Sequence, residues 1–244
     1  TDDYEWTGFI PFEELPYAFN PVEGYIVTAN NQVNPWGYPY LITTSWDYGF
    51  RADRIVDMIT SAPGPIDIAY IQQMQADAKD LNAETLVPIL TGIDFQAGTT
   101  NQAVALEMLA DWDFEARIDS QPAAIFEWFW WNLAMDTFQD DLPEDQWPVG
   151  GARWFEVMRN LVTTPGSTWW DDKATADTVE TRDDIFIAAF TETIQQLTDE
   201  YGKNTDNWPT WGDLHAATFR NQTLGESGIA PIEALFNRGP FATG

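Results

Sequence analysis

Five prolines limit what the first 45 residues of this chain can fold into. They stand at positions 11, 16, 21, 35 and 39. Each one lacks the backbone N–H and the free φ angle that the interior of a helix requires. We therefore expect loops around one short strand, which we place at residues 25–28 (YIVT) because β-branched and aromatic residues follow one another there.

From about residue 46 onward the pattern becomes helical. Apolar residues recur at three- and four-residue spacing in the segments 49–60, 62–90, 101–112, 121–139, 152–163 and 187–201. The last helix has a predicted capping arrangement from Thr181 to Asp184 and a stop at Gly202. Segment 121–139 is aromatic on nearly every side, so we expect it to be buried, with Trp128, Trp130 and Trp131 filling the core.

These patterns predict a strand and loop segment at 1–45 and a mainly helical region at 46–244, with a candidate seam near residue 150. A lone strand is unstable without partners. The tail after residue 229 offers only a loop and a short extended segment. Both ends of the chain are therefore expected to pack on polypeptide outside it, which makes the chain one structural unit of a larger protein.

The charge balance excludes one class of partner. The 39 Asp and Glu residues outnumber the 11 Lys and Arg residues, which gives a net charge of -28. Nucleic acid binding needs basic patches, so this partner is not expected. Such an acidic, aromatic-rich chain is typical of proteins that work in concentrated salt. The Debye length there is about 3 Å, so repulsion between the carboxylates of the chain is screened. We expect a secreted or cell-envelope protein of a halophile, and the alternative is an ordinary acidic secreted protein.

Two further absences narrow the chemistry. The chain has no cysteine, so disulfides and thiol nucleophiles are excluded. The apolar runs are broken well short of the roughly 18 residues that a membrane span requires. We therefore expect no membrane span.

Two asparagines, Asn30 and Asn31, stand where the predicted strand ends. A carboxamide there can close a turn, since Asn tolerates left-handed backbone and bonds to its own neighbours. Alternatively, the strand end holds the amide rigidly and directs it into a site. The residues alone leave both interpretations open.

Other reactive side chains have simpler explanations. The single histidine, His215, lacks the partners of a triad or a His-based metal site, so a packed structural role is expected. An acidic run lacks EF-hand spacing and is expected to be a solvated loop. It contains Asp140, Asp141, Glu144 and Asp145. Thr1 stays as an alternative nucleophile, because an N-terminal Thr can use its own α-amine as base.

Several stretches, taken in order, resemble the middle of the β subunit of penicillin acylases. The first are EWTGFIPFEELPYAFNPVEGYIVTANNQ (5–32) and YPYLITTSWDYGFRADRI (38–55). The later ones are MQADAKDLNAETLVPIL (74–90), LADWDFEARIDSQPAAIFEWFW (109–130), YGKNTDNWPTWGDLHAATF (201–219) and LFNRGP (235–240). This resemblance implies an α+β fold, namely a predominantly helical segment of an N-terminal-nucleophile (Ntn) hydrolase with the αββα architecture.

The same resemblance implies a hydrolase that acts on linear amide C–N bonds, as cephalosporin acylases and acyl-homoserine-lactone acylases also do. In this family a Ser released by autoproteolysis attacks the amide, with its own α-amine as base. The Asn of the NN pair stabilises the oxyanion and maps onto Asn30. A positioning Arg maps best onto Arg51, with Arg54 as the other match.

The sequence also departs from the family. No residue replaces the nucleophilic Ser, so we expect this segment to be inactive alone and to need the α subunit and the Ser-bearing β segment as partners. Some relatives bind a structural calcium through an Asp after a Tyr-Pro pair, but here Tyr40 and Leu41 follow Pro39. We therefore expect no cofactor or metal. The alternative function is a non-catalytic helical binding or assembly protein derived from the acylase scaffold.

Overall fold

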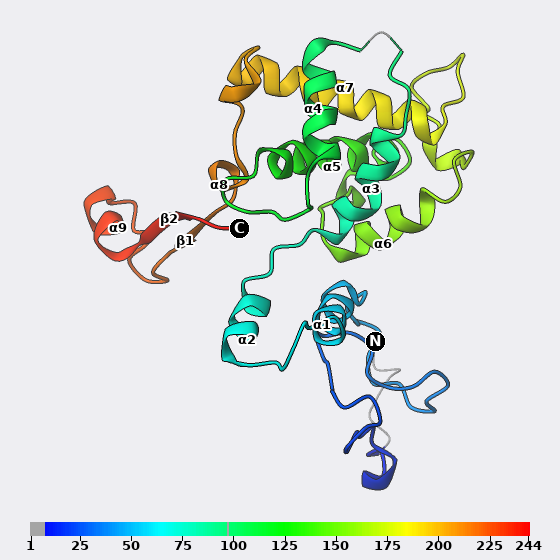
Figure 1. Ribbon diagram of the computed structural model, residues 1–244, viewed down its shortest axis with the longest axis vertical. Helices are drawn as coiled ribbons and strands as arrows, with labels where there is room; N and C mark the ends of the chain where they lie inside the picture. The colour runs from blue at the N-terminus through cyan, green and yellow to red at the C-terminus, as the bar shows by residue number, and fades with distance from the viewer. Residues whose placement is uncertain (1–7, 97) are drawn as a thin grey trace. The chain divides into compact units, whose positions relative to one another are not determined.

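The computed structural model describes residues 8–96 and 98–244, so Thr1 lies outside the described residues. The chain divides into two compact units, Thr1–Ala76 and Asp77–Gly244 (Figure 1). The boundary predicted near residue 45 lies inside the first unit, and the seam predicted near residue 150 lies inside the second. Both stay predictions.

Helices provide most of the regular structure in the described residues, which confirms the predicted helical character. The α-helices are α1 (Phe50–Thr60), α2 (Ile68–Gln75), α3 (Leu81–Thr91), α4 (Thr100–Ala110), α5 (Gln121–Phe138), α6 (Ala152–Leu161), α7 (Arg182–Tyr201), α8 (Trp211–Leu214) and α9 (Ala230–Phe236). Short 3-10 turns lie at Phe12–Glu14, Glu144–Gln146, Thr168–Trp170 and Thr205–Asn207. The strands of this part of the chain are β1 (Ala216–Phe219) and β2 (Arg238–Ala242).

Local capping explains where the longer helices begin and end. The Asp80 carboxylate accepts hydrogen bonds from the backbone N–H groups of Asn82 and Ala83 at the start of α3. Thr181 and Asp184 form the predicted capping box on α7. Gly202 ends α7 with a φ of 90°, a value that favours glycine.

The centre of the second unit is the contact between α5 and α7 (Figure 1). The ring of Phe129 on α5 lies 5.7 Å from the ring of Phe186 and 5.9 Å from that of Phe190, both on α7. All three side chains are fully buried. Fully burying such a side chain contributes about 1.5–3 kcal/mol, so this cluster is a main source of stability.

The aromatic residues of α5 do not all enter the core. Trp130 is 5% exposed and packs in the core, and Trp128 lies partly buried against it. Trp131 is 53% exposed, so the expectation that it fills the core was wrong. A helix that is apolar on nearly every side gives no periodicity to mark the outward face.

The strand predicted at residues 25–28 does not form. In the described part of the first unit, strand-type pairing is limited to an isolated parallel bridge between Asn31 and Asp47. β pairing in the second unit joins β1 and β2 as antiparallel neighbours, with Ala216 opposite Ala242. The tail, which was expected to be a loop with an extended segment, thus contains α9 as well as β2.

Candidate functional site

The two residues predicted to act together, Asn30 and Arg51, meet in the first unit. Arg51 lies in the first turn of α1, and its Nη2 donates to Asn30 Oδ1 at 2.7 Å and to the Ala29 carbonyl at 2.9 Å. The Asp47 carboxylate lies 3.4 Å from the same nitrogen. One guanidinium therefore joins the loop that carries Asn30 to the start of a helix.

The backbone of Asn30 is fixed in an uncommon conformation. Its φ is 64°, in the left-handed region that Asn tolerates better than most residues. Its carbonyl oxygen accepts from the Asp47 N–H at 2.8 Å. The neighbouring Asn31 accepts from the Ala29 N–H at 3.0 Å and so braces the same turn. This geometry fits the turn interpretation, and the Arg51 contact adds a constraint that a turn alone does not need.

The Arg51 contact also decides which way the carboxamide of Asn30 faces. A guanidinium carries only donors, so it must contact the amide oxygen. The Asn30 Nδ2 group is then directed away from Arg51, and no acceptor in the described residues bonds to it. Because the side chain is exposed, its two N–H donors are free to bind an oxygen atom brought from outside.

Arg54 makes a different contact from Arg51. Its Nη1 donates to Asp57 Oδ2 at 2.7 Å, one turn further along α1. The structure therefore brings Arg51, and not Arg54, to the carboxamide of Asn30. The catalytic roles assigned to Asn30 and Arg51 stay predictions.

His215 and the acidic run make structural contacts. The His215 ring stacks on Trp211 with the centroids 4.6 Å apart, and its Nδ1 lies 2.7 Å from Thr243 Oγ1. Asp140 accepts from the Lys173 N–H at 2.9 Å, and Asp141 pairs with the Lys173 ammonium. These acids therefore join two loops of the second unit.

Residues 8–96 and 98–244 contain neither a metal-binding cluster nor a membrane-spanning helix. No group of three or more His, Asp or Glu side chains is placed to hold a metal ion. No helix among these residues has the length and apolar character of a membrane span.

A pair of carboxyl groups in the second unit was missed by sequence reasoning. Asp80 at the start of α3 and Glu127 on α5 share a hydrogen bond and are both half-buried. Burial, together with the charge of Asp80, raises the pKa of Glu127 to about 8. Near neutral pH a protonated Glu127 therefore donates to an ionised Asp80. The two residues lie far apart in sequence, so no local spacing reveals the pair.

The chain is similar in sequence to known acylases. A sequence model of the family described as Penicillin amidase matches residues 1–244. An acyl-homoserine lactone acylase, QuiP, of Pseudomonas syringae pv. syringae is 26% identical over 99% of this chain and 31% of its own length. The penicillin G acylase of Escherichia coli is 24% identical over 90% of this chain and 29% of its own length.

A solved structure has the same fold. The thermostable penicillin G acylase from Alcaligenes faecalis matches with a TM-score of 0.62 and 21% identity, over 91% of this chain and 44% of that one. The chain spans less than a third of the length of the two curated relatives, at 31% and 29%.

Proposed function

Because the chain belongs to the penicillin amidase family, we propose that it forms part of an amidohydrolase that cleaves a linear acyl amide. The relatives are named acyl-homoserine lactone acylases and penicillin acylases. The proposed substrate is therefore a small molecule, an antibiotic or a quorum signal, whose acyl chain is joined through a linear amide bond.

In this proposal the nucleophile is an N-terminal Ser on polypeptide outside this chain. Its Oγ bonds to the acyl carbon, and the carbonyl electron pair moves onto oxygen. The α-amine of the Ser takes the hydroxyl proton and passes it to the leaving amine as the C–N bond breaks. Water then hydrolyses the acyl ester and releases the carboxylic acid. This chain supplies stabilisation of the oxyanion.

The observation that carries the proposal is the 2.7 Å contact between Arg51 Nη2 and Asn30 Oδ1. It sets the carboxamide before substrate arrives, so its N–H donors need no reorganisation when negative charge develops. A preorganised donor of this kind is worth about 3–4 kcal/mol in the transition state. Arg51 would thus act as a positioning residue through Asn30.

A covering partner is part of the same proposal. In the first unit, large apolar side chains such as Phe9, Val22 and Trp36 are almost fully exposed. Large apolar side chains left in water are covered when a protein partner binds. We assign this surface to the remaining acylase polypeptide, meaning the α subunit and the Ser-bearing β segment.

Substitution of Asn30 in the full-length protein tests the proposal. Asn30→Asp keeps the oxygen that Arg51 contacts but removes both N–H donors, so kcat should fall about 10²- to 10³-fold. Amine release from penicillin G and from an N-acyl-homoserine lactone is measured, with the exposed Asn207→Ala as control. Retention of kcat within threefold in Asn30→Asp would exclude Asn30 as the oxyanion donor. Absence of hydrolysis in the unmodified protein would favour the binding or assembly alternative.

A further inference from the structure

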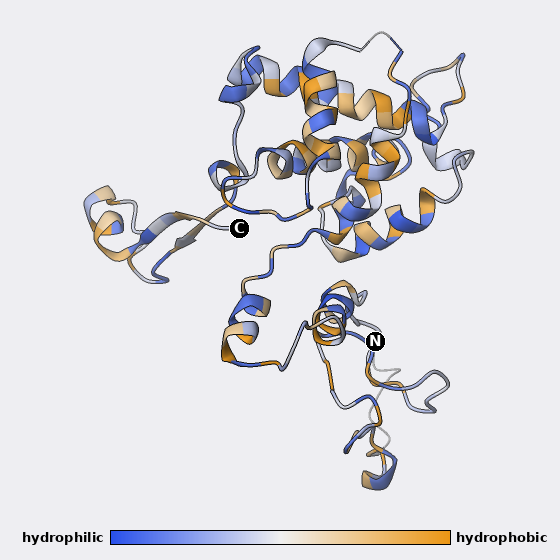
Figure 2. Ribbon diagram, viewed as in Figure 1, coloured by the Kyte–Doolittle hydropathy of each residue, from blue (hydrophilic) through white to orange (hydrophobic). Residues whose placement is uncertain are grey.

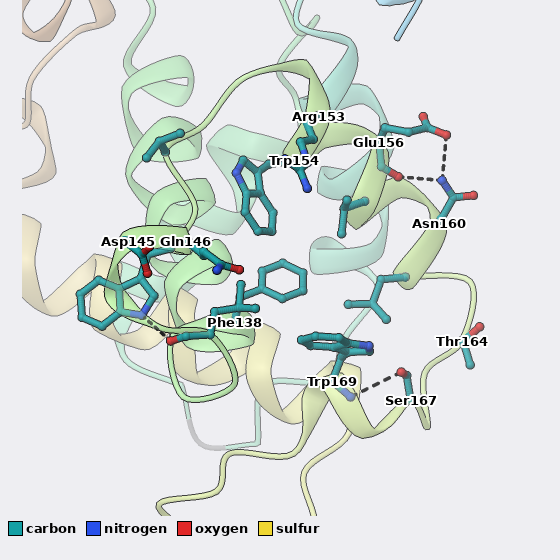
Figure 3. A pocket seen from close by; sticks show the side chains of 15 residues that line it. Phe138, Asp145, Gln146, Arg153, Trp154, Glu156, Asn160, Thr164, Ser167 and Trp169 are labelled. Carbon is teal, nitrogen blue, oxygen red and sulfur yellow. Dashed lines mark hydrogen bonds between the residues drawn. The ribbon is translucent and has the colours of Figure 1, made fainter. Parts of the chain in front are cut away.

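A cavity of about 880 Å³ opens on the second unit (Figure 3). The end of α5, the loop that follows it, α6 and the turn Thr168–Trp170 form its walls. Four aromatic residues line those walls, namely Phe138, Trp147, Trp154 and Trp169. The volume lies in the range of about 300–1,000 Å³ that small-molecule sites occupy.

The aromatic walls are formed before any ligand binds. The ring of Phe138 lies 5.0 Å from that of Trp154 and 5.7 Å from that of Trp169. Trp147 Nε1 donates to the carbonyl groups of Gln139 and Leu142 at 3.0 and 3.1 Å, so its polar edge is satisfied. Trp169 is nevertheless 42% exposed. An apolar ligand would remove this ring from water without reorganising the wall.

The cavity wall also contains a cation, Arg153. In Figure 3 the nitrogen end of Arg153 lies beside Trp154, directed into the space that the labelled side chains surround. In the part of the chain that the structure describes, no acceptor bonds to this guanidinium. Acidic residues outnumber basic ones 39 to 11, so an unpaired guanidinium is notable.

The two acids of the cavity do not neutralise Arg153. Glu156 accepts from Arg159 Nε and Nη2, both at 2.9 Å, so its charge is already paired. Asp145 lies at the rim, exposed in the turn Glu144–Gln146. Among the described residues that line the cavity, Arg153 and Asp145 are then the charges without an ion pair, and their two charges cancel. This balance admits a monoanion at Arg153 and disfavours a dianion such as phosphate.

We propose that this cavity binds an amphipathic monocarboxylate, an aryl or medium-chain acid. Its carboxylate pairs with the Arg153 guanidinium, whose planar fork matches a carboxylate. Its apolar body packs against Phe138, Trp154 and Trp169. The proposal is independent of the amide hydrolysis proposed above, since it concerns binding and none of its residues belongs to the first unit.

Titration calorimetry on the full-length protein with 4-phenylbutyrate tests the pairing. Arg153→Gln should weaken binding about tenfold, the low end for a charge-assisted hydrogen bond at an open site. Arg220→Gln is the control, because Arg220 pairs with Glu226 and both lie outside the cavity, so this variant should bind like the unmodified protein. The neutral analogue 4-phenylbutyramide should bind about tenfold more weakly. Equal affinity for the amide, or for Arg153→Gln, would overturn the proposal.

Two further measurements locate the ligand. In protein labelled with 5-fluorotryptophan, the ¹⁹F resonance that disappears in Trp169→Phe should shift when 4-phenylbutyrate is added. If that resonance does not move, the ligand does not bind in this cavity and the proposal is overturned. The same result would follow if another polypeptide covered the cavity. Asp145→Asn should bind equally or more tightly. Weaker binding by that variant would identify a cationic or zwitterionic ligand and overturn the carboxylate assignment.

Discussion

In the first unit Phe9 and Trp36 are fully exposed, whereas in the second unit Phe129 and Trp170 are fully buried. Both units are rich in aromatic residues, so composition does not explain the difference. Figure 2 shows hydrophobic residues on the helices of the second unit and also along the loops of the first. What differs is the number of elements available to cover them.

The second unit has several helices that pack face to face around α5 and α7. The first unit has α1 and α2, and the buried apolar residues among its described part are Ala52 and Met58. A hydrophobic core needs at least two packed layers. The second unit therefore has a hydrophobic core of its own, while the described part of the first is held largely by hydrogen bonds and leaves large apolar side chains exposed.

The largest expected effect comes from truncating one aromatic ring in each unit of the 244-residue chain. Phe129→Ala leaves a cavity among α5 and α7 and should lower the free energy of unfolding by about 3–5 kcal/mol. Trp36→Ala removes a ring that contacts mainly water and should change it by less than about 0.5 kcal/mol. Urea unfolding followed by circular dichroism compares the two. A loss of unfolding free energy in Trp36→Ala as large as that in Phe129→Ala would contradict the exposed position of Trp36 in the first unit.

The buried carboxyl pair gives the second unit its own pH dependence. The pKa of Glu127 is raised in the folded state from 4.5 to about 8, so the folded chain binds more protons than the unfolded chain between these values. The stability contributed by neutral Glu127 is therefore present at low pH and is lost as pH rises toward 8. We expect a loss of about 3–4 kcal/mol between pH 5 and pH 8.

Glu127→Gln should remove the part of this slope that Glu127 causes, because Gln carries no titrating group and can still donate to Asp80. The part caused by Asp136 should stay, since burial and the nearby Glu192 raise the pKa of Asp136 to about 7. The exposed Glu107→Gln on α4 is the control and should keep the slope. Unfolding free energies are measured in urea at each pH. An unchanged slope in Glu127→Gln would show that other groups cause the pH dependence.

The smallest effect on stability is expected when one helix cap is removed in each unit. Thr181→Ala removes the capping box of α7 and should cost about 1 kcal/mol, because α7 is part of the core. Asp67→Ala removes the cap of α2, which accepts from the Tyr70 N–H at 2.9 Å. Since α2 has no buried residue, the main thermal transition should not move. Scanning calorimetry measures both, and equal shifts would argue for a single cooperative unit.

Local signals in the sequence predicted the helices well. The α7 capping box at Thr181 and the stop at Gly202 depend on neighbouring residues, so they are readable from one segment alone. The prediction of a strand at residues 25–28 was wrong for the opposite reason. A strand depends on a pairing partner, which local composition does not reveal. Pairing between β1 and β2 was missed because the intervening residues include α9.

The candidate sites differ in the same respect, because some could be predicted from the sequence and others depend on the fold. Asn30 and Arg51 could be named because the order of short motifs resembles a known family, and the structure then placed them 2.7 Å apart. The Asp80 and Glu127 pair had no such guide, because it forms only when α3 and α5 pack. That Arg153 finds no acceptor among the described residues is likewise a property of the folded surface, which no sequence pattern records.

The uneven burial of the tryptophans gives this chain two optical populations. Trp130, Trp170 and Trp208 lie in an apolar interior, whereas the ring of Trp36 lies in water. Indole emission shifts to longer wavelength as its surroundings become more polar, so the blue side of the spectrum reports the second unit. The red side includes Trp36 and would change when a partner covers the first unit. Unfolding of the second unit can thus be followed at the blue side of the spectrum in an unlabelled sample.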